Sequence, residues 1–189
     1  LECPSYDARG LKGMGLLYAT SNIGASHMAG DTAYTELFGV GTKTDGLTYE
    51  GKAALTKHFQ DVFAIIDAVG MCVFVSIRYT LDTEAGYLPT RLAEMVKQAT
   101  GAEVTPQSLL EAADRVYTLE RLFLTKAGFS RSDDTLASRM AEPMPAGPLE
   151  GETFELDRLL DDYYVERGWD AKGVPTLEKL ESLGIAHYV

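Results

Sequence analysis

The segment from Thr105 to Gly128 most constrains how this chain folds, because helix signals mark both of its ends and run along its length. Thr105 is suited to cap a helix, and Pro106 to occupy the first helical position, where a missing N–H costs nothing. Gly128 supplies a stop. Between these ends, apolar residues recur at helical spacing at Leu109, Ala112, Ala113, Val116, Leu119 and Phe123. We therefore predict a long helix whose apolar face enters the core.

Similar signals recur along the rest of the chain. Thr48 as N-cap, with Glu50 in the first turn, predicts a helix that ends at Gly70. Further helices are predicted over residues 89–101, 153–167 and 177–183, the first opened by a proline and each stopped at or beside a glycine. Residues 71–79 fit either a strand or a buried helix. No strong alternating pattern occurs, so the predicted fold class is mostly α and multihelical.

Length and composition limit the classes of protein. The 189 residues suit one large domain or two small ones, with a possible boundary near residues 80–105. A formal net charge of -11 argues against nucleic-acid binding, since phosphate recognition needs basic patches. No apolar run approaches the ~20 residues of a membrane span, and no signal peptide is visible. With 2 cysteines there is no disulfide framework, so a reducing cytoplasm is expected.

Glycines are frequent over residues 9–46, and each of them is unfavourable within a helix by roughly 1 kcal/mol relative to alanine. One explanation is the close approach of the backbone to a neighbouring element or a ligand. The other is a flexible surface loop. Composition alone leaves both explanations open.

His27 is the candidate catalytic residue. It follows Asn22-Ile23-Gly24-Ala25-Ser26, a run that includes small side chains, which let a ligand approach the imidazole closely. An imidazole in such a place can donate or accept a proton near neutral pH. The alternative is a structural histidine in a loop.

The run Asp67-Ala68-Val69-Gly70-Met71-Cys72 is the candidate cofactor and metal site. A carboxylate at a helix C-terminus opposes the helix dipole, which suggests a partner for Asp67, such as the paired N–H donors of a pterin-like ring. Cys72 is a candidate metal ligand, although a lone cysteine among apolar residues is also typical of a small buried hydrophobe. Because Cys3 is the only other cysteine, the remaining ligands of a metal site would lie elsewhere.

Several blocks together resemble the C-terminal portion of the tungsten-containing aldehyde ferredoxin oxidoreductases. They occur in the order found in that family and span nearly the whole chain. The Asp67–Cys72 run resembles the family's Asp-x-x-Gly-Leu-Cys motif, and Gly24-Ala25-Ser26-His27 a second family block. The other blocks are residues 2–10, 15–22, 119–121 with 128, 131 and 133–134, and 163–164 with 167–170, 173–176 and 180–184.

The resemblance implies a function for these residues. Family members oxidise aldehydes to carboxylic acids at a tungsten held by two pterin dithiolenes, and electrons leave through a [4Fe–4S] cluster to ferredoxin. Asp67, Gly70 and Met71 would contact the pterin, and Cys72 would bind iron. His27 would lie near the metal and handle a proton. The metal, tungsten or molybdenum, stays open at this point.

The chain also departs from the family pattern. Met71 replaces a usual leucine, Ile23 a common arginine, and Thr135-Leu136-Ala137 a usual Leu-Pro. The family's N-terminal pterin-binding domain, with its other cluster cysteines, is expected to be absent, so that residues 1–189 form a C-terminal helical region that is inactive alone. The expected partners are that domain, ferredoxin, an aldehyde and a second copy in a homodimer. The alternative is a non-catalytic helical module for protein interaction.

Overall fold

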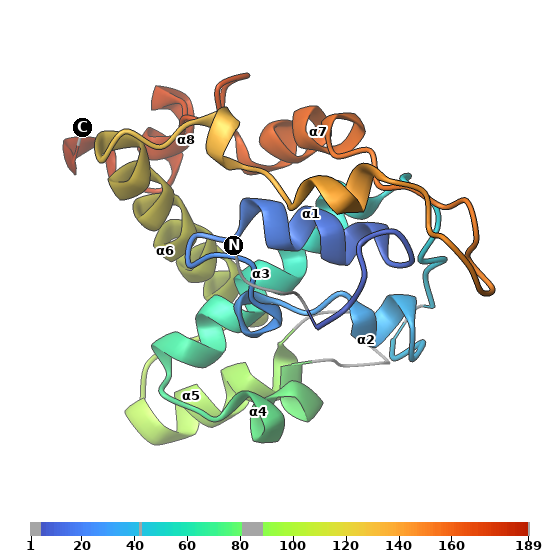
Figure 1. Ribbon diagram of the computed structural model, residues 1–189. Helices are drawn as coiled ribbons and strands as arrows, with labels where there is room; N and C mark the ends of the chain where they lie inside the picture. Colours follow the sequence, from blue (N-terminus) through green and yellow to red (C-terminus); the bar gives the residue numbers. More distant parts are fainter. Residues whose placement is uncertain (1–4, 42, 81–88, 189) are drawn as a thin grey trace.

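The computed structural model describes residues 5–41, 43–80 and 89–188 (Figure 1). Within these residues the chain is helical and has no strand, apart from an isolated bridge between Trp169 and Pro175. The predicted mostly-α fold is thus confirmed. The α-helices are α1 (Lys12–Thr20), α2 (Ala33–Glu36), α3 (Lys52–Ala68), α4 (Val73–Thr80), α5 (Thr90–Thr100), α6 (Pro106–Lys126), α7 (Asp157–Arg167) and α8 (Leu177–Ser182). Short 3-10 helices are η1 (His27–Ala29), η2 (Arg131–Asp133), η3 (Ser138–Ala141) and η4 (Ala186–Tyr188).

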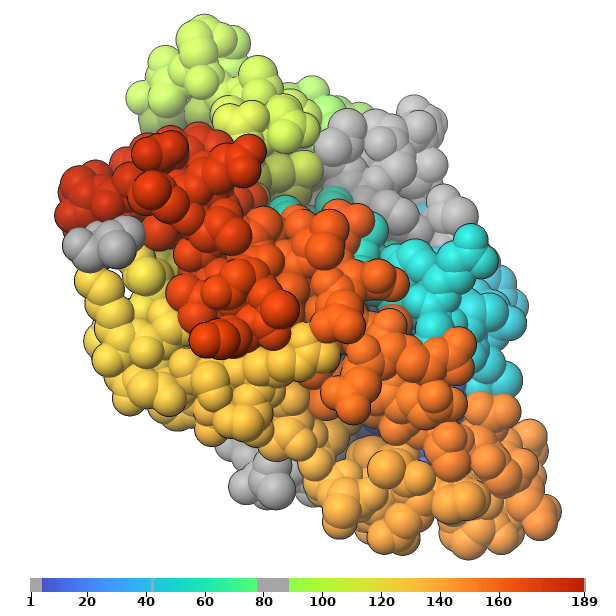
Figure 2. Space-filling view, turned by 90° about the horizontal axis from the view of Figure 1, so that it is seen from above, coloured from blue at the N-terminus to red at the C-terminus, as the bar shows by residue number. Residues whose placement is uncertain are grey.

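Helix α3 is the centre of the fold, because α1, α6 and α7 all pack against it (Figure 1). Its apolar side chains Phe59, Val62 and Ile66 are fully buried. Helices α4 and α5 pack on each other at one end of the molecule. Figure 2 shows that the C-terminal third of the chain, yellow through red, forms a continuous covering on one face. Helix α3 thus runs between α1 from the N-terminal half of the chain and α6 and α7 from the C-terminal half.

Helix α6 begins as predicted, but it buries a different face. The Thr105 hydroxyl accepts the N–H of Ser108 at 3.0 Å, in a capping box with Pro106 at the first position. Of the predicted apolar face, Val116 is 36% exposed and Phe123 is 71% exposed. The buried face keeps Ala113 of the predicted set and adds polar, charged and aromatic side chains: its members are Ala113, Asp114, Tyr117, Thr118, Arg121 and Leu122. Charged residues can occupy it because partners from distant segments neutralise them.

The predicted start of the helix over residues 48–70 was wrong. Thr48 does not cap α3: its hydroxyl donates to the Asp45 carbonyl, and Gly51, with φ of 72°, occupies the N-cap position. The helix begins at Lys52, whose buried ammonium donates to Glu36 and to the Asp45 carbonyl. A long-range ion pair therefore sets the first residue of the helix, and the local capping signal does not.

The glycines near the N-terminus allow close packing. Both Gly13 and Gly15 lie within α1, which is buried along its whole length. A Cβ at Gly15 would come within 2.6 Å of the Phe154 ring, and one at Gly13 within 2.9 Å of the Glu36 carboxylate. The Gly13 N–H donates to that carboxylate at 3.0 Å. Of the two explanations left open by composition, close approach applies to these two positions.

Residues 71–79, left between strand and helix by the sequence, belong to a helix from Val73 onward. The possible domain boundary near residues 80–105 falls partly on 81–88, which lie outside the described residues, as does Cys3. Across the ranges that the structure covers, every helix is too short or too polar to cross a membrane.

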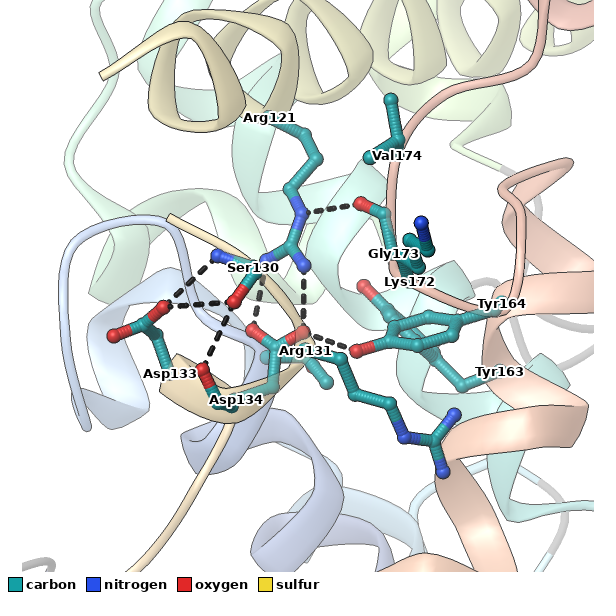
Figure 3. Close-up of polar contacts among 12 residues, drawn as sticks. Arg121, Ser130, Arg131, Asp133, Asp134, Tyr163, Tyr164, Lys172, Gly173 and Val174 are labelled. Atoms are coloured by element: carbon teal, nitrogen blue, oxygen red, sulfur yellow. Dashed lines mark hydrogen bonds and ion pairs between the residues drawn. The ribbon is translucent and has the colours of Figure 1, made fainter. Parts of the chain in front are cut away.

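Residues from two of the family-like blocks meet in one buried network (Figure 3). Arg121 of α6 donates to both oxygens of Asp134, at 2.7 and 2.6 Å, and to the Gly173 carbonyl at 2.8 Å. The Tyr164 hydroxyl donates to the same carboxylate, and the Arg121 guanidinium lies over the Trp169 ring at 4.9 Å. The network ties α6 and α7 to the segments that carry Asp134 and Gly173, which gives these residues a structural role.

Candidate functional site

The Asp67–Cys72 run forms the C-terminal end of α3 and the turn after it. The turn depends on Gly70, whose φ of 71° is strained for any residue with a side chain. Two backbone hydrogen bonds close it, from the Gly70 N–H to the Asp67 carbonyl at 3.0 Å and from the Met71 N–H to the Ile66 carbonyl at 3.2 Å. The side chain of Met71 packs against the apolar face of α3. The chain therefore reverses between Asp67 and Cys72.

Cys72 is a free, exposed cysteine. The structure thus excludes the alternative interpretation of this residue as a small buried hydrophobe. Its neighbours Phe74 and Val75, in the first turn of α4, are 75% and 57% exposed. The described residues hold no group of three or more histidine, cysteine, aspartate or glutamate side chains that could bind a metal ion. The role of Cys72 as a metal ligand therefore stays a prediction.

His27 is the first residue of η1 and is half-buried. The Ser26 hydroxyl caps this short helix by accepting the Met28 N–H at 3.1 Å. The Ser5 hydroxyl lies 3.1 Å from His27 Nδ1, and the Tyr6 ring meets the imidazole edge-on at 6.1 Å between centroids. The N-terminal segment therefore fixes one side of the imidazole.

Asp67 and the loop that carries His27 meet at one pocket. The pocket has a volume of about 130 Å³ and lies between residues 22–29, the C-terminal half of α3, and α6. Its lining includes Asn22, Ile23, Ala29, Gln60, Asp67, Tyr117 and Glu120. Partial burial raises the pKa of the Asp67 carboxyl above its ordinary value. Neither His27 nor Cys72 lines this pocket, so the structure does not bring all of the predicted site residues to one cavity.

Asn22 is the member of this pocket whose hydrogen bonding is incomplete. Its Nδ2 donates to the Tyr117 carbonyl at 3.2 Å and to Glu120 Oε2 at 3.1 Å. Its Oδ1 is buried, and no partner for this oxygen is found among the described residues. With the carboxylates of Asp67 and Glu120, the polar lining of the pocket includes three groups that accept hydrogen bonds. A ligand rich in N–H donors, such as the edge of a pterin ring, fits this set.

Reasoning from the sequence did not single out Asn22 and Glu120 as site residues. They are 98 positions apart and meet only because η1, α3 and α6 pack together. Both stood in family-like blocks, yet nothing in the spacing of those blocks indicated contact.

A larger, open pocket of about 990 Å³ lies between the η2–η3 segment and α7. Its lining includes the charged residues Arg131, Asp134, Glu155, Asp157 and Arg158, and the apolar residues Leu136, Met140 and Phe154. Each of these charges already has a partner: Asp134 binds Arg121, Arg131 pairs with Asp161 at 2.6 Å, and Arg158 with Glu155 at 3.5 Å. None of the residues predicted from the sequence lines this pocket.

Comparison with known proteins adds independent findings. A family model described as "Aldehyde ferredoxin oxidoreductase, domains 2 & 3" matches residues 1–185. The tungsten-containing aldehyde ferredoxin oxidoreductases of Pyrococcus furiosus and Thermococcus kodakarensis are 38% and 36% identical over all of this chain. The chain spans about 30% of the length of these relatives.

A solved structure, the active-site complex BamBC of benzoyl coenzyme A reductase with 1,5-dienoyl-CoA, resembles this chain in fold. The TM-score is 0.59 at 24% identity, over 78% of this chain and 21% of the other. At this level of identity the likeness concerns the fold alone. The family match and the identities to the archaeal enzymes, which cover the entire chain, lead to one conclusion: this chain belongs to the aldehyde ferredoxin oxidoreductase family and corresponds to its domains 2 and 3.

Proposed function

We propose that this chain is the C-terminal part of a tungsten or molybdenum pterin oxidoreductase that oxidises aldehydes to carboxylic acids and passes electrons through a [4Fe–4S] cluster to ferredoxin. The observation that carries the proposal is the acceptor-lined pocket at Asp67, with the buried Asn22 oxygen that has no partner in the described structure. The relatives, which are tungsten-containing aldehyde ferredoxin oxidoreductases, support the choice of tungsten and aldehyde.

The bound bis-pterin metal supplies the two-electron redox step. Within this chain, Asp67 accepts N–H donors of the pterin at the end of α3. Gly70 and Met71 form the turn between Asp67 and Cys72, and they are proposed to contact the pterin there. The turn requires the left-handed conformation that Gly70 adopts. The residues of this chain thus bind and orient the cofactor from one side.

Cys72 is proposed as one of four thiolate ligands of the cluster. Its exposure suits a ligand that other polypeptide completes. The other ligands would come from the polypeptide that makes up the remaining 70% or so of the relatives' length. Because one thiolate does not hold a [4Fe–4S] cluster, we expect the 189-residue chain alone to be inactive.

His27 is proposed to hold and release a proton. Oxidation of an aldehyde with water gives the carboxylic acid, two protons and two electrons, so the site must export protons as electrons leave. The Ser5 hydroxyl engages Nδ1 of His27, which leaves Nε2 for exchange with the substrate side. The electrons leave through the cluster, and the protons pass to solvent.

Exposed apolar side chains beside Cys72 suit contact with the rest of the longer protein. Phe74 and Val75 flank the proposed cluster ligand and are more than half exposed. The same exposure also favours the second candidate function, a non-catalytic module that binds a separate protein. The two candidates differ in whether iron and pterin are present in the longer protein.

The test of the cluster ligand uses the longer protein that contains this chain. Cys72→Ala is expected to abolish the iron–sulfur absorbance and aldehyde-dependent reduction of ferredoxin, because it removes one of the four thiolates. Glu181→Ala, at an exposed position on α8, is the control and should keep both. An intact cluster in Cys72→Ala, or a wild-type protein without iron and pterin, would refute the proposed function.

The test of the proton-handling residue compares two histidines. His27→Ala is expected to lower turnover by about a hundredfold or more while metal and pterin content stay unchanged. His187→Ala, which removes an exposed histidine near the C-terminus, should have wild-type turnover. Undiminished turnover in His27→Ala would contradict this part of the proposal.

A further inference from the structure

We propose that Glu120 is a positioning residue, which holds the side-chain amide of Asn22 so that its carbonyl oxygen faces the Asp67 pocket and accepts an N–H of the bound pterin. The inference rests on the proposed function, because it takes the pterin as the ligand. It adds two residues of this chain to the cofactor site: Asn22, which contacts the pterin ring, and Glu120, which acts through Asn22.

The orientation of the Asn22 amide follows from the chemistry of its two partners. The Tyr117 carbonyl and the Glu120 carboxylate can only accept hydrogen bonds, so the atom that meets both, at 3.2 and 3.1 Å, must be the NH₂ group. Both N–H groups are then used. The oxygen is left on the opposite side, where it cannot exchange places with the nitrogen without breaking both bonds.

The Asn22 oxygen needs a donor from outside the described residues. It is buried and has no partner there, and an unpaired buried acceptor is a costly group that proteins rarely keep without reason. The pocket beside it, about 130 Å³ in volume, has room for the donor group of a ligand. The nearby Asp67 carboxylate is also an acceptor, so a ring with several N–H donors along one edge satisfies both residues.

A second side-chain amide in the same pocket, that of Gln60, differs from Asn22 in its hydrogen bonding. Gln60 also lines the pocket, but both its amide nitrogen and its carbonyl oxygen have partners within the fold. Its Nε2 donates to Thr20 Oγ1 at 3.1 Å, and its Oε1 accepts from Tyr163 and Arg167 at 2.6 and 2.7 Å. Gln60 is therefore structural, and Asn22 remains the neutral side chain available to a ligand.

The experiment compares pterin content and retention in the longer protein carrying this chain. Glu120→Ala frees the Asn22 amide to rotate, and Asn22→Leu removes the acceptor. Both should release pterin about three- to tenfold faster on dilution, measured by the fluorescence of the oxidised pterin, because each weakens one hydrogen bond. Glu120→Gln keeps an acceptor oxygen for Asn22 and should restore wild-type retention. Glu111→Ala, an exposed carboxylate on the same helix, is the matched control.

The position of the Asn22 amide is tested separately in the 189-residue chain by ¹⁵N NMR. The side-chain NH₂ of Asn22 should exchange slowly in wild type and Glu120→Gln, and at least fivefold faster in Glu120→Ala. Circular dichroism verifies folding in each variant, and Glu120→Ala alone decides the outcome if Asn22→Leu does not fold.

The outcomes separate the two proposals. A wild-type longer protein that contains no pterin would refute the proposed function. A wild-type protein with pterin, together with unchanged pterin release in Glu120→Ala, would overturn the positioning inference and leave the proposed function standing. Faster release in both Glu120→Ala and Glu120→Gln would also overturn it, since a charge effect would then explain the loss.

Discussion

Replacing Asp31 by asparagine should stabilise the folded chain at neutral pH, because this carboxylate is buried and pairs with no cation among the residues that the structure describes. Its side chain lies before α2, where Oδ1 accepts the Ala33 N–H at 2.9 Å, and the residue is 6% exposed. Burial raises the pKa of Asp31 to about 6, against the opposing effect of the Ala33 N–H and with a smaller contribution from the charge of Glu36. Asparagine keeps an acceptor oxygen for Ala33 and carries no charge.

The magnitude follows from the difference between the folded and unfolded pKa values. The ordinary value is 3.8 and the folded value about 6, and each unit is worth about 1.36 kcal/mol. The folded state binds the proton more tightly, so this contribution to the free energy of unfolding is present in full below the unfolded pKa. It is lost as pH rises through the folded pKa, and the total loss is about 3 kcal/mol at most. Most of the loss, about 2 kcal/mol, falls between about pH 4.5 and about pH 7.5.

Urea unfolding of wild type and Asp31→Asn at these two pH values measures the effect. The stability advantage of the variant should grow by about 2 kcal/mol from the acidic to the neutral condition. Asp157→Asn is the control, because that side chain is 97% exposed and should show no such growth. An advantage that stays constant with pH, or that shrinks at neutral pH, would refute the argument that an unneutralised carboxylate is buried at this position.

Three further predictions concern packing and association. Arg167→Met should lower the free energy of unfolding by about 3–5 kcal/mol in urea titrations, because it removes a buried guanidinium that binds Asp61 at 2.6 Å and Gln60 at 2.7 Å, and leaves Asp61 with Lys57 as its remaining cation; a loss below about 1 kcal/mol would contradict this. Gly15→Ala should cost about 1–3 kcal/mol in the same assay, because its Cβ would lie 2.6 Å from the Phe154 ring. An unchanged midpoint would show that the ring moves freely. The 189-residue chain should form dimers in analytical ultracentrifugation, and Phe74→Glu should shift it to monomer. A monomeric wild type over a wide concentration range would disprove a homodimer formed through this surface.

The helix boundaries show how far local signals reach. Thr105 and Gly101 limit helices where the sequence places them, because a cap is a hydrogen bond or a left-handed turn made within a few residues. Thr48 carried an equally good signal and does not cap α3. There the buried ion pair between Lys52 and Glu36, 16 positions apart, outweighs the local preference.

Packing faces were harder to predict than boundaries. Periodicity assigned Val116 and Phe123 to the core, yet both are exposed. Arg121 and Arg167 are buried, at 3% and 0% exposure, because Asp134 and Asp61 neutralise them from other segments. A hydrophobicity pattern assigns every charged side chain to the surface. It contains no information about which charged side chains pair with a buried partner from a distant segment.

For the candidate site, too, some features could be predicted from the sequence and others depended on the tertiary structure. Residue types and their order were enough to indicate the mostly-α fold and the family, because these depend on local helix energetics and on short motifs along the chain. The pocket that joins Asn22 and Glu120 to Asp67 depends on how η1, α3 and α6 pack. Contacts between segments nearly a hundred residues apart arise only when chain folding brings them together, and no local pattern records which side chains will then share one cavity.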